Sequence, residues 1–311
     1  MRPIPAVFRS RLAAVIAVFL LVALILPFTV GSYILGVLTV AFYFGIFAMS
    51  WDLLFGYAGE VNFGPTFLIG LGAYTAGIVD SRFGWSIGWC VLSGTAAAVV
   101  GGVALALPAL RLRGPYFGLV TLVAVLLLES FIVVMSDLTG GEIGLTVPDV
   151  ISVVPRANYF IALACLVVVG TLLTALVRSP FGLILEAIGQ DPVEAAALGF
   201  NVSKHKLAAF IVSALFSGSA GAFLVFYLGT ASVGSLIDIS VGAQVVIGAV
   251  LGGRRSIVGG VFGAIFLIAA GEVLRPLGTL STFVVSLAAL IFIMLVPSGM
   301  LGALLYRRDR T

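Results

Sequence analysis

The chain has 311 residues, of which 61% are hydrophobic and only 9% are charged, and its formal net charge is +3. An ordinary soluble domain carries about 25% charged residues. The composition therefore excludes a water-soluble globule, because too little polar surface would remain to solvate it, and it predicts a polytopic membrane protein.

The first predicted span runs from Ala13 to Val30 and follows three basic residues, Arg2, Arg9 and Arg11. This apolar run is long for the core of a signal peptide, and no small-x-small cleavage site follows it. We therefore expect the run to be retained as a membrane span. The two cysteines, Cys90 and Cys165, lie within later apolar runs and are interpreted as small hydrophobic residues of the core.

Apolar segments recur along the rest of the chain and predict an all-α bundle of about ten transmembrane helices. Two of the segments are short for a hydrocarbon core about 30 Å thick and are rich in glycine or flanked by it, so we expect them to pack inside the bundle. The predicted spans are residues 13–30, 34–54, 66–79 (short), 86–109, 115–135, 158–177, 207–228, 241–252 (short), 257–274 and 282–305.

The distribution of basic residues predicts the orientation. With the N-terminus inside the cell, only Arg82, Arg156 and Arg275 fall outside. The other thirteen of the sixteen Lys and Arg residues are then cytoplasmic: Arg2, Arg9, Arg11, Arg111, Arg113, Arg178, Lys204, Lys206, Arg254, Arg255, Arg307, Arg308 and Arg310. Basic residues accumulate on the cytoplasmic side of membrane proteins, so both termini are predicted to be cytoplasmic.

The stretch 55–65, FGYAGEVNFGP, is interrupted by glycines and is the best candidate for irregular backbone that lines a cavity. It carries Glu60, and a second acid, Glu129, lies within the span 115–135. Ionisable residues inside a membrane are candidates for function. Asp52 and Glu272 lie close enough to span ends to reach the interface, so structural roles are favoured for both.

On the predicted outer side, residues 136–158 form a loop that contains Asp137, Glu142 and Asp149 and the turn-rich sequence TGG. This loop is either a solvated connection or a docking surface for an external partner. The sequence LTGGE within it is similar to the signature loop of ABC ATPases, but it is predicted to lie outside the cell. The chain has no GxxxxGK[ST] phosphate loop, so it is not expected to bind ATP in that manner.

The longest cytoplasmic stretch, residues 178–206, predicts a compact capped helix. Asp191 is the expected N-cap, Pro192 the first helical residue and Glu194 the third, which is the spacing of a capping box. Gly199 supplies a left-handed stop. A short helix with alanines on its surface is suited to being held by a partner, although an ordinary connecting loop is the alternative. His205, at the end of this stretch, is expected to be a solvated surface residue.

Six sequence segments resemble the permease subunits of bacterial branched-chain amino-acid ABC importers, specifically the M-type of the two paralogous subunits. The resemblance covers about residues 45–270 in order. Its motifs are WDLLFGYAGEVNFG with GLGAYTAG, LRLRGPYFGLVTL, TGGEIGL, SPFGLILEAIGQDPVEAAALGFNVSKHKLAAF and LGGRRSIVGGVFGA. This chain departs from the family pattern at Glu60, where Gln is usual, at Pro65, and at Arg254 and Arg255, where Leu-Gly is more usual.

The resemblance implies a fold like that of type II ABC importer permeases, with one permease domain over residues 1–311 and a coupling loop at about 178–206. Coupling to the ATPases is expected to involve Glu186, Asp191, Pro192, Glu194, Ala195, Ala196, Leu198 and Gly199. The translocation path is expected to include Tyr57, Glu60, Asn62, Gly64, Gly72 and Tyr74. Docking of the binding protein is expected at Thr139, Gly140, Gly141 and Glu142.

The sequence therefore predicts a non-catalytic, multi-pass subunit of the bacterial inner membrane that imports a small solute, such as a branched-chain or other hydrophobic amino acid. The expected partners are two ABC ATPases, which bind the ATP and magnesium, a homologous second permease, an external solute-binding protein and the lipid bilayer. No cofactor, metal or nucleic acid is expected on this chain. The alternative is a secondary transporter coupled to an ion, which would require Glu60 or Glu129 as the ion carrier.

Overall fold

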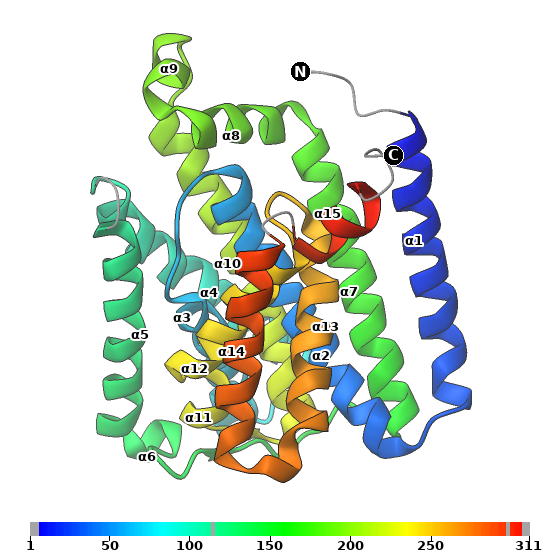
Figure 1. Ribbon diagram of the computed structural model, residues 1–311. Coiled ribbons are helices and arrows are strands. Elements are labelled where there is room, and N and C mark those ends of the chain that lie inside the picture. The colour runs from blue at the N-terminus through cyan, green and yellow to red at the C-terminus, as the bar shows by residue number, and fades with distance from the viewer. Residues whose placement is uncertain (1–5, 113–115, 297–298, 307–311) are drawn as a thin grey trace.

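The computed structural model describes residues 6–112, 116–296 and 299–306, so the basic residues Arg2, Arg113, Arg307, Arg308 and Arg310 lie outside the described part. The chain forms a helical bundle, with a few short elements at its two ends (Figure 1). Its elements are α1 (Ala6–Ile25), η1 (Leu26–Phe28), α2 (Ser32–Asp52), η2 (Leu53–Tyr57), α3 (Pro65–Phe83), α4 (Ile87–Ala109), α5 (Tyr116–Val134), α6 (Ser136–Thr139), β1 (Leu145–Thr146), α7 (Pro155–Arg178), α8 (Pro180–Gln190), α9 (Pro192–Ala197), α10 (Val202–Leu228), β2 (Thr230–Ala231), α11 (Val233–Leu236), α12 (Ile239–Gly252), α13 (Ile257–Val273), η3 (Arg275–Leu277), α14 (Thr279–Leu295) and α15 (Gly299–Tyr306).

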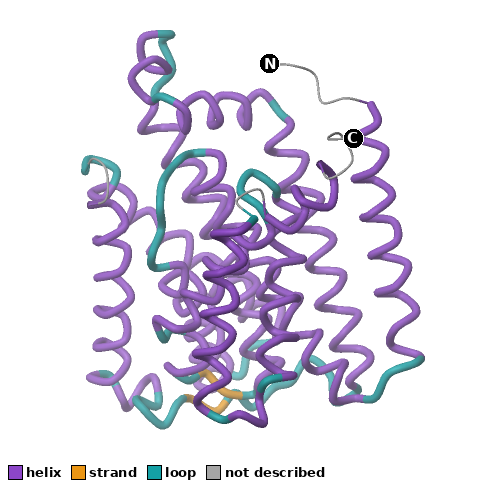
Figure 2. The backbone as a smooth tube through the Cα atoms, in the orientation of Figure 1, coloured by secondary structure: helices purple, strands orange, loops and turns teal. Residues whose placement is uncertain are grey.

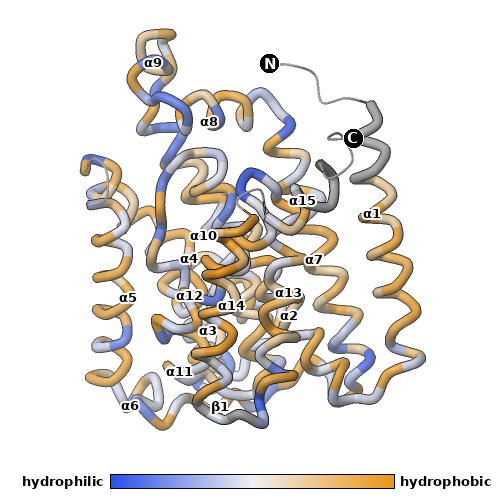
Figure 3. The backbone as a smooth tube through the Cα atoms, viewed as in Figure 1, coloured by the Kyte–Doolittle hydropathy of each residue, from blue (hydrophilic) through white to orange (hydrophobic). Residues whose placement is uncertain are grey.

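The prediction of a helical, polytopic membrane protein is confirmed. Among the described residues, six helical stretches are long and apolar enough to cross a membrane, and three shorter apolar helices accompany them. The long helices of the bundle are coloured mainly as hydrophobic (Figure 3). Many of their apolar side chains also lie on the outer surface, as do Leu127 and Phe131 on α5 and Trp89 on α4. Such surfaces are suited to lipid or to another apolar helix.

The centre of the bundle is α2, whose residues 41–52 are all buried. It packs against α7, α10, α12 and α13. The helices α3 and α4 also pack against α10. A helix that is apolar all round and buried on all sides belongs in the interior of a bundle. The predicted short span 66–79 is also internal, although α3 is longer than predicted and extends from Pro65 to Phe83.

The structure differs from the predicted all-α arrangement at two places. The span 282–305 is two helices, α14 and α15, separated around Val296, which has φ −129° and ψ 71°. Val296 precedes Pro297, and a residue before proline is disfavoured in the helical region. The second difference is a pair of two-residue antiparallel strands at the end of the bundle opposite α9, in which Leu145 faces Ala231 and Thr146 faces Thr230 (Figure 2). This pair joins the 136–158 loop to the chain that follows α10.

Candidate functional site

The helix pair α8 and α9 projects from one end of the bundle (Figure 1). The N-cap prediction for α9 is confirmed, because the Asp191 carboxylate accepts hydrogen bonds from the backbone N–H groups of Val193 (2.7 Å) and Glu194 (3.1 Å). The reciprocal half of the predicted capping box is not formed. The backbone N–H of Asp191 instead donates to the carbonyl of Ala187 at the end of α8, so that donor is already satisfied without the Glu194 side chain.

The stop of α9 follows the prediction. Gly199 has φ +91°, its N–H donates to Ala196, and the N–H of Phe200 donates to Ala195. These two bonds are the pair that defines a Schellman motif, in which the residue after the helix adopts the left-handed conformation. The helix therefore has fixed ends, although it contains only six residues.

The free surface of α9 is apolar at two positions. Val193 is 76% exposed and Leu198 is 75% exposed, whereas Ala195 is buried against the rest of the loop. Ala196 and Glu194 are also exposed. Large apolar side chains held out by a rigid, capped helix are typical of a surface that a partner protein covers. All eight residues predicted to couple to a partner lie on α8, on α9 or at their ends.

Three aromatic rings hold α8 beside the start of α10. His205 lies between Phe181 and Phe200, with ring centroids 6.0 Å and 6.4 Å away. Its Nδ1 is 2.7 Å from the carbonyl oxygen of Asn201. The sequence predicts a solvated surface residue at His205, and the structure shows a partly exposed ring that is held by these contacts. The imidazole ring of His205 thus connects α8 to α10, while α9 projects beyond this contact.

On its inner side, α8 contacts the end of α2 and the turn between α12 and α13. Glu186 forms an ion pair with Arg255 in that turn, with 3.5 Å between the charged atoms. Near the end of α8, Gly189 lies so close to the carbonyl of Tyr57 that a side chain at this glycine would overlap it. The projecting helices are thus in direct contact with the backbone of the bundle.

Arg255 is the centre of this contact, a role that no sequence pattern predicts for it. Its backbone N–H donates to Asp52 (3.2 Å), its Nε donates to the carbonyl of Gly56 (3.0 Å), and its own carbonyl accepts from the Tyr57 hydroxyl (3.0 Å). It is also the one described non-glycine residue with positive φ, at +61°. A non-glycine residue in this region is uncommon and persists where its surroundings fix it.

The predicted irregular backbone after α2 is present. The last turn of the helix, η2, is a π-helix, and residues 58–64 that follow it are not helical. These residues pass from the α8 end of the bundle to the start of α3 (Figure 2). π-turns often occur at functional positions, and non-helical backbone at membrane depth requires surrounding protein or a cavity.

Within this segment, Glu60 forms an ion pair with Lys206 of α10, and both side chains are largely buried. Asn62 is buried and turned inward: its side chain accepts from the N–H of Gly64, and its carbonyl accepts from the indole N–H of Trp51 (2.6 Å). Gly64 lies against the backbone of Thr121 in α5. The segment therefore touches α5, α8 and α10.

The two remaining path residues lie on α3. Gly72 is in close contact with the backbone of Gly218 in α10, and Tyr74 is buried with a hydroxyl that has no hydrogen-bond partner among the described residues. A cavity of about 570 Å³ lies elsewhere, between α2, α10, α12, α13 and α14. None of the six predicted path residues lines this cavity.

At the opposite end of the bundle, the four residues predicted to dock an external protein form a tight turn after α5. Thr139 is buried and its hydroxyl donates to the carbonyls of Ile132 (2.6 Å) and Met135 (2.9 Å). Gly140 and Gly141 follow in the left-handed region, and Glu142 is exposed. The next residue, Ile143, is 96% exposed, so the turn presents one charged and one apolar side chain.

Comparison with known proteins gives a consistent set of relatives. The family model described as "Branched-chain amino acid transport system / permease component" matches residues 33–301. The high-affinity branched-chain amino acid transport system permease protein LivM of Escherichia coli (strain K12) is 26% identical over 324 residues, which cover 91% of this chain and 73% of LivM. LivH of the same strain, another permease protein of that system, is 26% identical over 83% of this chain and 91% of its own length.

A shorter similarity extends to a different kind of transport protein. The fructose import permease protein FrcC of Rhizobium meliloti is 34% identical over 106 residues, which cover 33% of this chain and 29% of FrcC. No solved structure matches the chain at a significant level.

Proposed function

The chain belongs to the family of permease components of branched-chain amino acid transport systems, and on that premise we propose that it forms half of the membrane pore of an ABC importer. It is a multi-pass permease subunit of the inner membrane. A second, homologous permease completes the pore, two ATPases bind its cytoplasmic side, and a solute-binding protein delivers the solute from outside. The chemistry of ATP hydrolysis, with its magnesium ion, belongs to the ATPases, and this subunit is not catalytic.

The observation that carries the proposal is the capped helix α9, with Val193 and Leu198 exposed on a projecting, rigid end. Closure of the ATPases on ATP moves this helix. Because α8 is in contact with Tyr57 and Arg255, the displacement reaches the irregular segment 58–64, which opens or closes the path. The proposed path residues are Tyr57, Glu60, Asn62, Gly64, Gly72 and Tyr74. The buried hydroxyl of Tyr74 has no hydrogen-bond partner among the described residues, so it is a donor that a passing solute can use.

The proposed cargo is a branched-chain or other hydrophobic amino acid, in keeping with the branched-chain amino acid transport system to which LivM and LivH belong. The external binding protein is proposed to dock on the turn at Thr139, Gly140, Gly141 and Glu142. This turn presents the exposed side chains of Glu142 and Ile143.

A ten-span arrangement with both ends in the cytoplasm is part of the proposal. It is supported by the basic residues in the sequence and by the position of the two ends of the described chain. The start of α1 and the end of α15 both lie at the end of the bundle where α8 and α9 project (Figure 1). An even number of crossings brings both ends to the same side.

The orientation is tested by single cysteines in a background without Cys90 and Cys165. Val193→Cys on α9 and Ile143→Cys in the outer turn replace two apolar side chains that are 76% and 96% exposed. A membrane-impermeant thiol reagent applied to intact spheroplasts is expected to label only Ile143→Cys. After permeabilisation it is expected to label both. Labelling of Val193→Cys in intact spheroplasts would contradict the proposed orientation.

The energy source separates the importer from an ion-coupled carrier. A carrier must protonate and deprotonate an acid in its path, whereas Glu60 is paired with Lys206. We expect Glu60→Gln, whose amide oxygen still accepts a hydrogen bond from the ammonium group, and Glu129→Gln to retain most of the uptake.

The readout is uptake of radiolabelled leucine by proteoliposomes that contain the complete importer, with ATP held constant inside. Uptake is expected to continue when an uncoupler collapses the proton gradient. Loss of accumulation both in an amide variant and with the uncoupler would instead establish the secondary transporter.

A further inference from the structure

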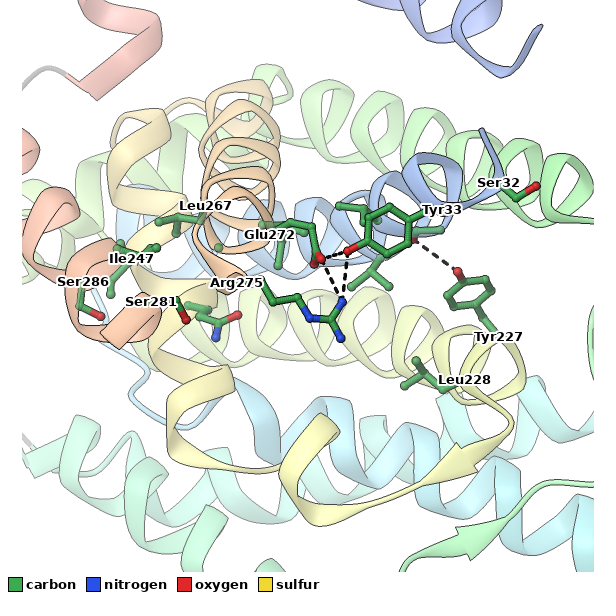
Figure 4. Close-up of a pocket in the computed structure, with 17 residues that line it drawn as sticks. Ser32, Tyr33, Tyr227, Leu228, Ile247, Leu267, Glu272, Arg275, Ser281 and Ser286 are labelled. Carbon is green, nitrogen blue, oxygen red and sulfur yellow. Dashed lines mark hydrogen bonds and ion pairs between the residues drawn. The ribbon is translucent and has the colours of Figure 1, made fainter. Parts of the chain in front are cut away.

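The cavity of about 570 Å³ lies at the end of the bundle opposite α9, and its wall combines a charged cluster with an apolar surface (Figure 4). Its volume is within the range of about 300–1,000 Å³ that small-molecule sites occupy. It is formed by the start of α2, the end of α10, α12, and the pair α13 and α14 with the turn between them. Segments far apart in the sequence thus meet around it.

The charged cluster consists of three side chains. Glu272 accepts a hydrogen bond from the Tyr33 hydroxyl and pairs with Arg275, whose Nη1 lies 3.0 Å from Oε1. The same Nη1 donates to the Tyr33 oxygen at 3.1 Å. These are the hydrogen bonds drawn between the three side chains in Figure 4.

Both charged groups keep binding capacity for a ligand. A guanidinium group has five N–H donors, and a carboxylate has two oxygens. Within the described residues, the hydrogen bonds of Arg275 use only Nη1 and those of Glu272 use only Oε1. The Arg275 side chain is 70% exposed and that of Glu272 is 27% exposed, so neither side chain is fully enclosed by the protein.

The cluster contains one positive and one negative charge, so its formal charge is zero. A ligand with a single charge meets one attractive and one repulsive group there, whereas a zwitterion finds an opposite charge for each end. Apart from the cluster, the cavity is lined by aliphatic side chains and by a smaller number of polar ones. The aliphatic residues are Val37, Val40, Ile247, Leu267, Ile268 and Val285, and the polar ones are Ser32, Tyr227, Gln244, Ser281 and Ser286. Ionisable groups beside such a wall are candidates for function in a membrane protein.

We propose that this cavity binds a zwitterion with an aliphatic body, namely a free aliphatic amino acid, at the outer side of the permease. The carboxylate of the ligand binds Arg275, its ammonium group binds Glu272, and its side chain packs on the aliphatic wall. This inference rests on the proposed importer function, which makes such a solute the cargo and this end of the bundle the outer one. The head group of a zwitterionic lipid shares the same chemistry, so the experiment must distinguish the two sources.

Photo-crosslinking of the complete importer in nanodiscs tests the site directly, with a diazirine analogue of leucine as the probe. We expect labelled peptides from α2, α13 and α14 around the cavity. Leucine should compete with the probe, whereas leucinamide, which carries only the positive charge, and N-acetylleucine, which carries only the negative charge, should not. Equal competition by all three would overturn the proposal, because the cavity would then be a merely apolar groove.

A pair of glycine variants tests the location. A Cβ atom added at Gly271, which lines the cavity, or at Gly88 in α4, which does not, meets no atom within 4 Å. Gly271→Leu fills the cavity with the charges intact and should lower labelling by about tenfold, a change equal to one decade in affinity. Gly88→Leu is the matched control and should label like the wild type. Equal labelling in both variants would overturn the assignment to this cavity.

A charge variant tests the recognition of the ammonium group. Glu272→Gln leaves Arg275 as the one charge of the cluster, so N-acetylleucine is expected to become a competitor as good as leucine. If the variant still discriminated between leucine and N-acetylleucine as the wild type does, Glu272 would not bind the ammonium group of the ligand.

The lipid alternative is tested by the nanodisc composition. Labelling should be the same in phosphatidylglycerol and in phosphatidylethanolamine, because a free amino acid is the occupant. Strong labelling in the first lipid that disappears in the second would assign the cavity to the zwitterionic head group and overturn the proposal.

ATP-dependent uptake of leucine by the same wild-type complex, measured with its binding protein, separates this inference from the proposed function. Uptake without labelling of the cavity would contradict only the site. Absence of any ATP-dependent uptake would contradict the importer itself, whatever the labelling.

Discussion

Replacing Ala196 by glutamate is expected to abolish ATP-driven uptake while the chain still inserts into the membrane. Ala196 is exposed on α9, close to Val193 and Leu198. A new carboxylate there must be buried without a partner when an ATPase covers the helix. An unpaired charge in an interface costs about 2–5 kcal/mol, which corresponds to a loss of binding of roughly 30-fold to several thousandfold.

The measurement combines leucine uptake, ATP hydrolysis and co-purification of the ATPases. Ala196→Ser is the matched control, because it stays small and uncharged, and it should retain coupling. Gly199→Val is expected to weaken coupling by a second route, since a β-branched residue at φ +91° costs roughly 1–2 kcal/mol and loosens the stop of α9. Full uptake in Ala196→Glu and Gly199→Val would mean that α9 is only a connector.

The second large effect is expected at Gly72, where α3, α4 and α10 meet. An added Cβ would overlap the backbone of Gly218 in α10, and the carbonyl of Gly72 is in turn approached by Gly94 of α4. Small residues let membrane helices approach each other to backbone contact. Gly72→Ala should therefore destabilise the protein by about 1–3 kcal/mol through overpacking, and Gly72→Leu should prevent a stable bundle.

Thermal unfolding of the purified protein measures this effect, with Gly88→Ala as the control because its Cβ would meet no neighbouring atom. In the control, alanine is expected to stabilise α4 slightly, since glycine in a helix costs roughly 0.5–1 kcal/mol relative to alanine. A Gly72→Ala protein as stable as the control would show that the backbones of α3 and α10 are not in close contact at this position.

The features that could be predicted from the sequence are the local ones. The N-cap at Asp191, the left-handed stop at Gly199 and the irregular backbone around Glu60 each depend on a few adjacent residues. The helix α8 is not predicted as a separate element, although it lies within the cytoplasmic stretch 178–206. The partners of Glu60 and Arg255 could not be predicted, because Lys206 lies 146 residues away and Gly56 lies 199 residues away. Such pairs depend on how the helices pack, which no local pattern records.

The continuity of α10 links the two ends of the molecule. Its N-cap, Asn201, lies two residues after the α9 stop at Gly199, and its C-cap, Gly229, leads into the strand β2 that pairs with β1. The helix has 27 residues, so it is a rigid rod roughly 40 Å long. A partner that shifts one end of this rod changes the position of the other.

Thermodynamic reciprocity then applies. If a bound ATPase raises the affinity of the permease for an external protein by some factor, the bound external protein raises the affinity of the permease for the ATPase by the same factor.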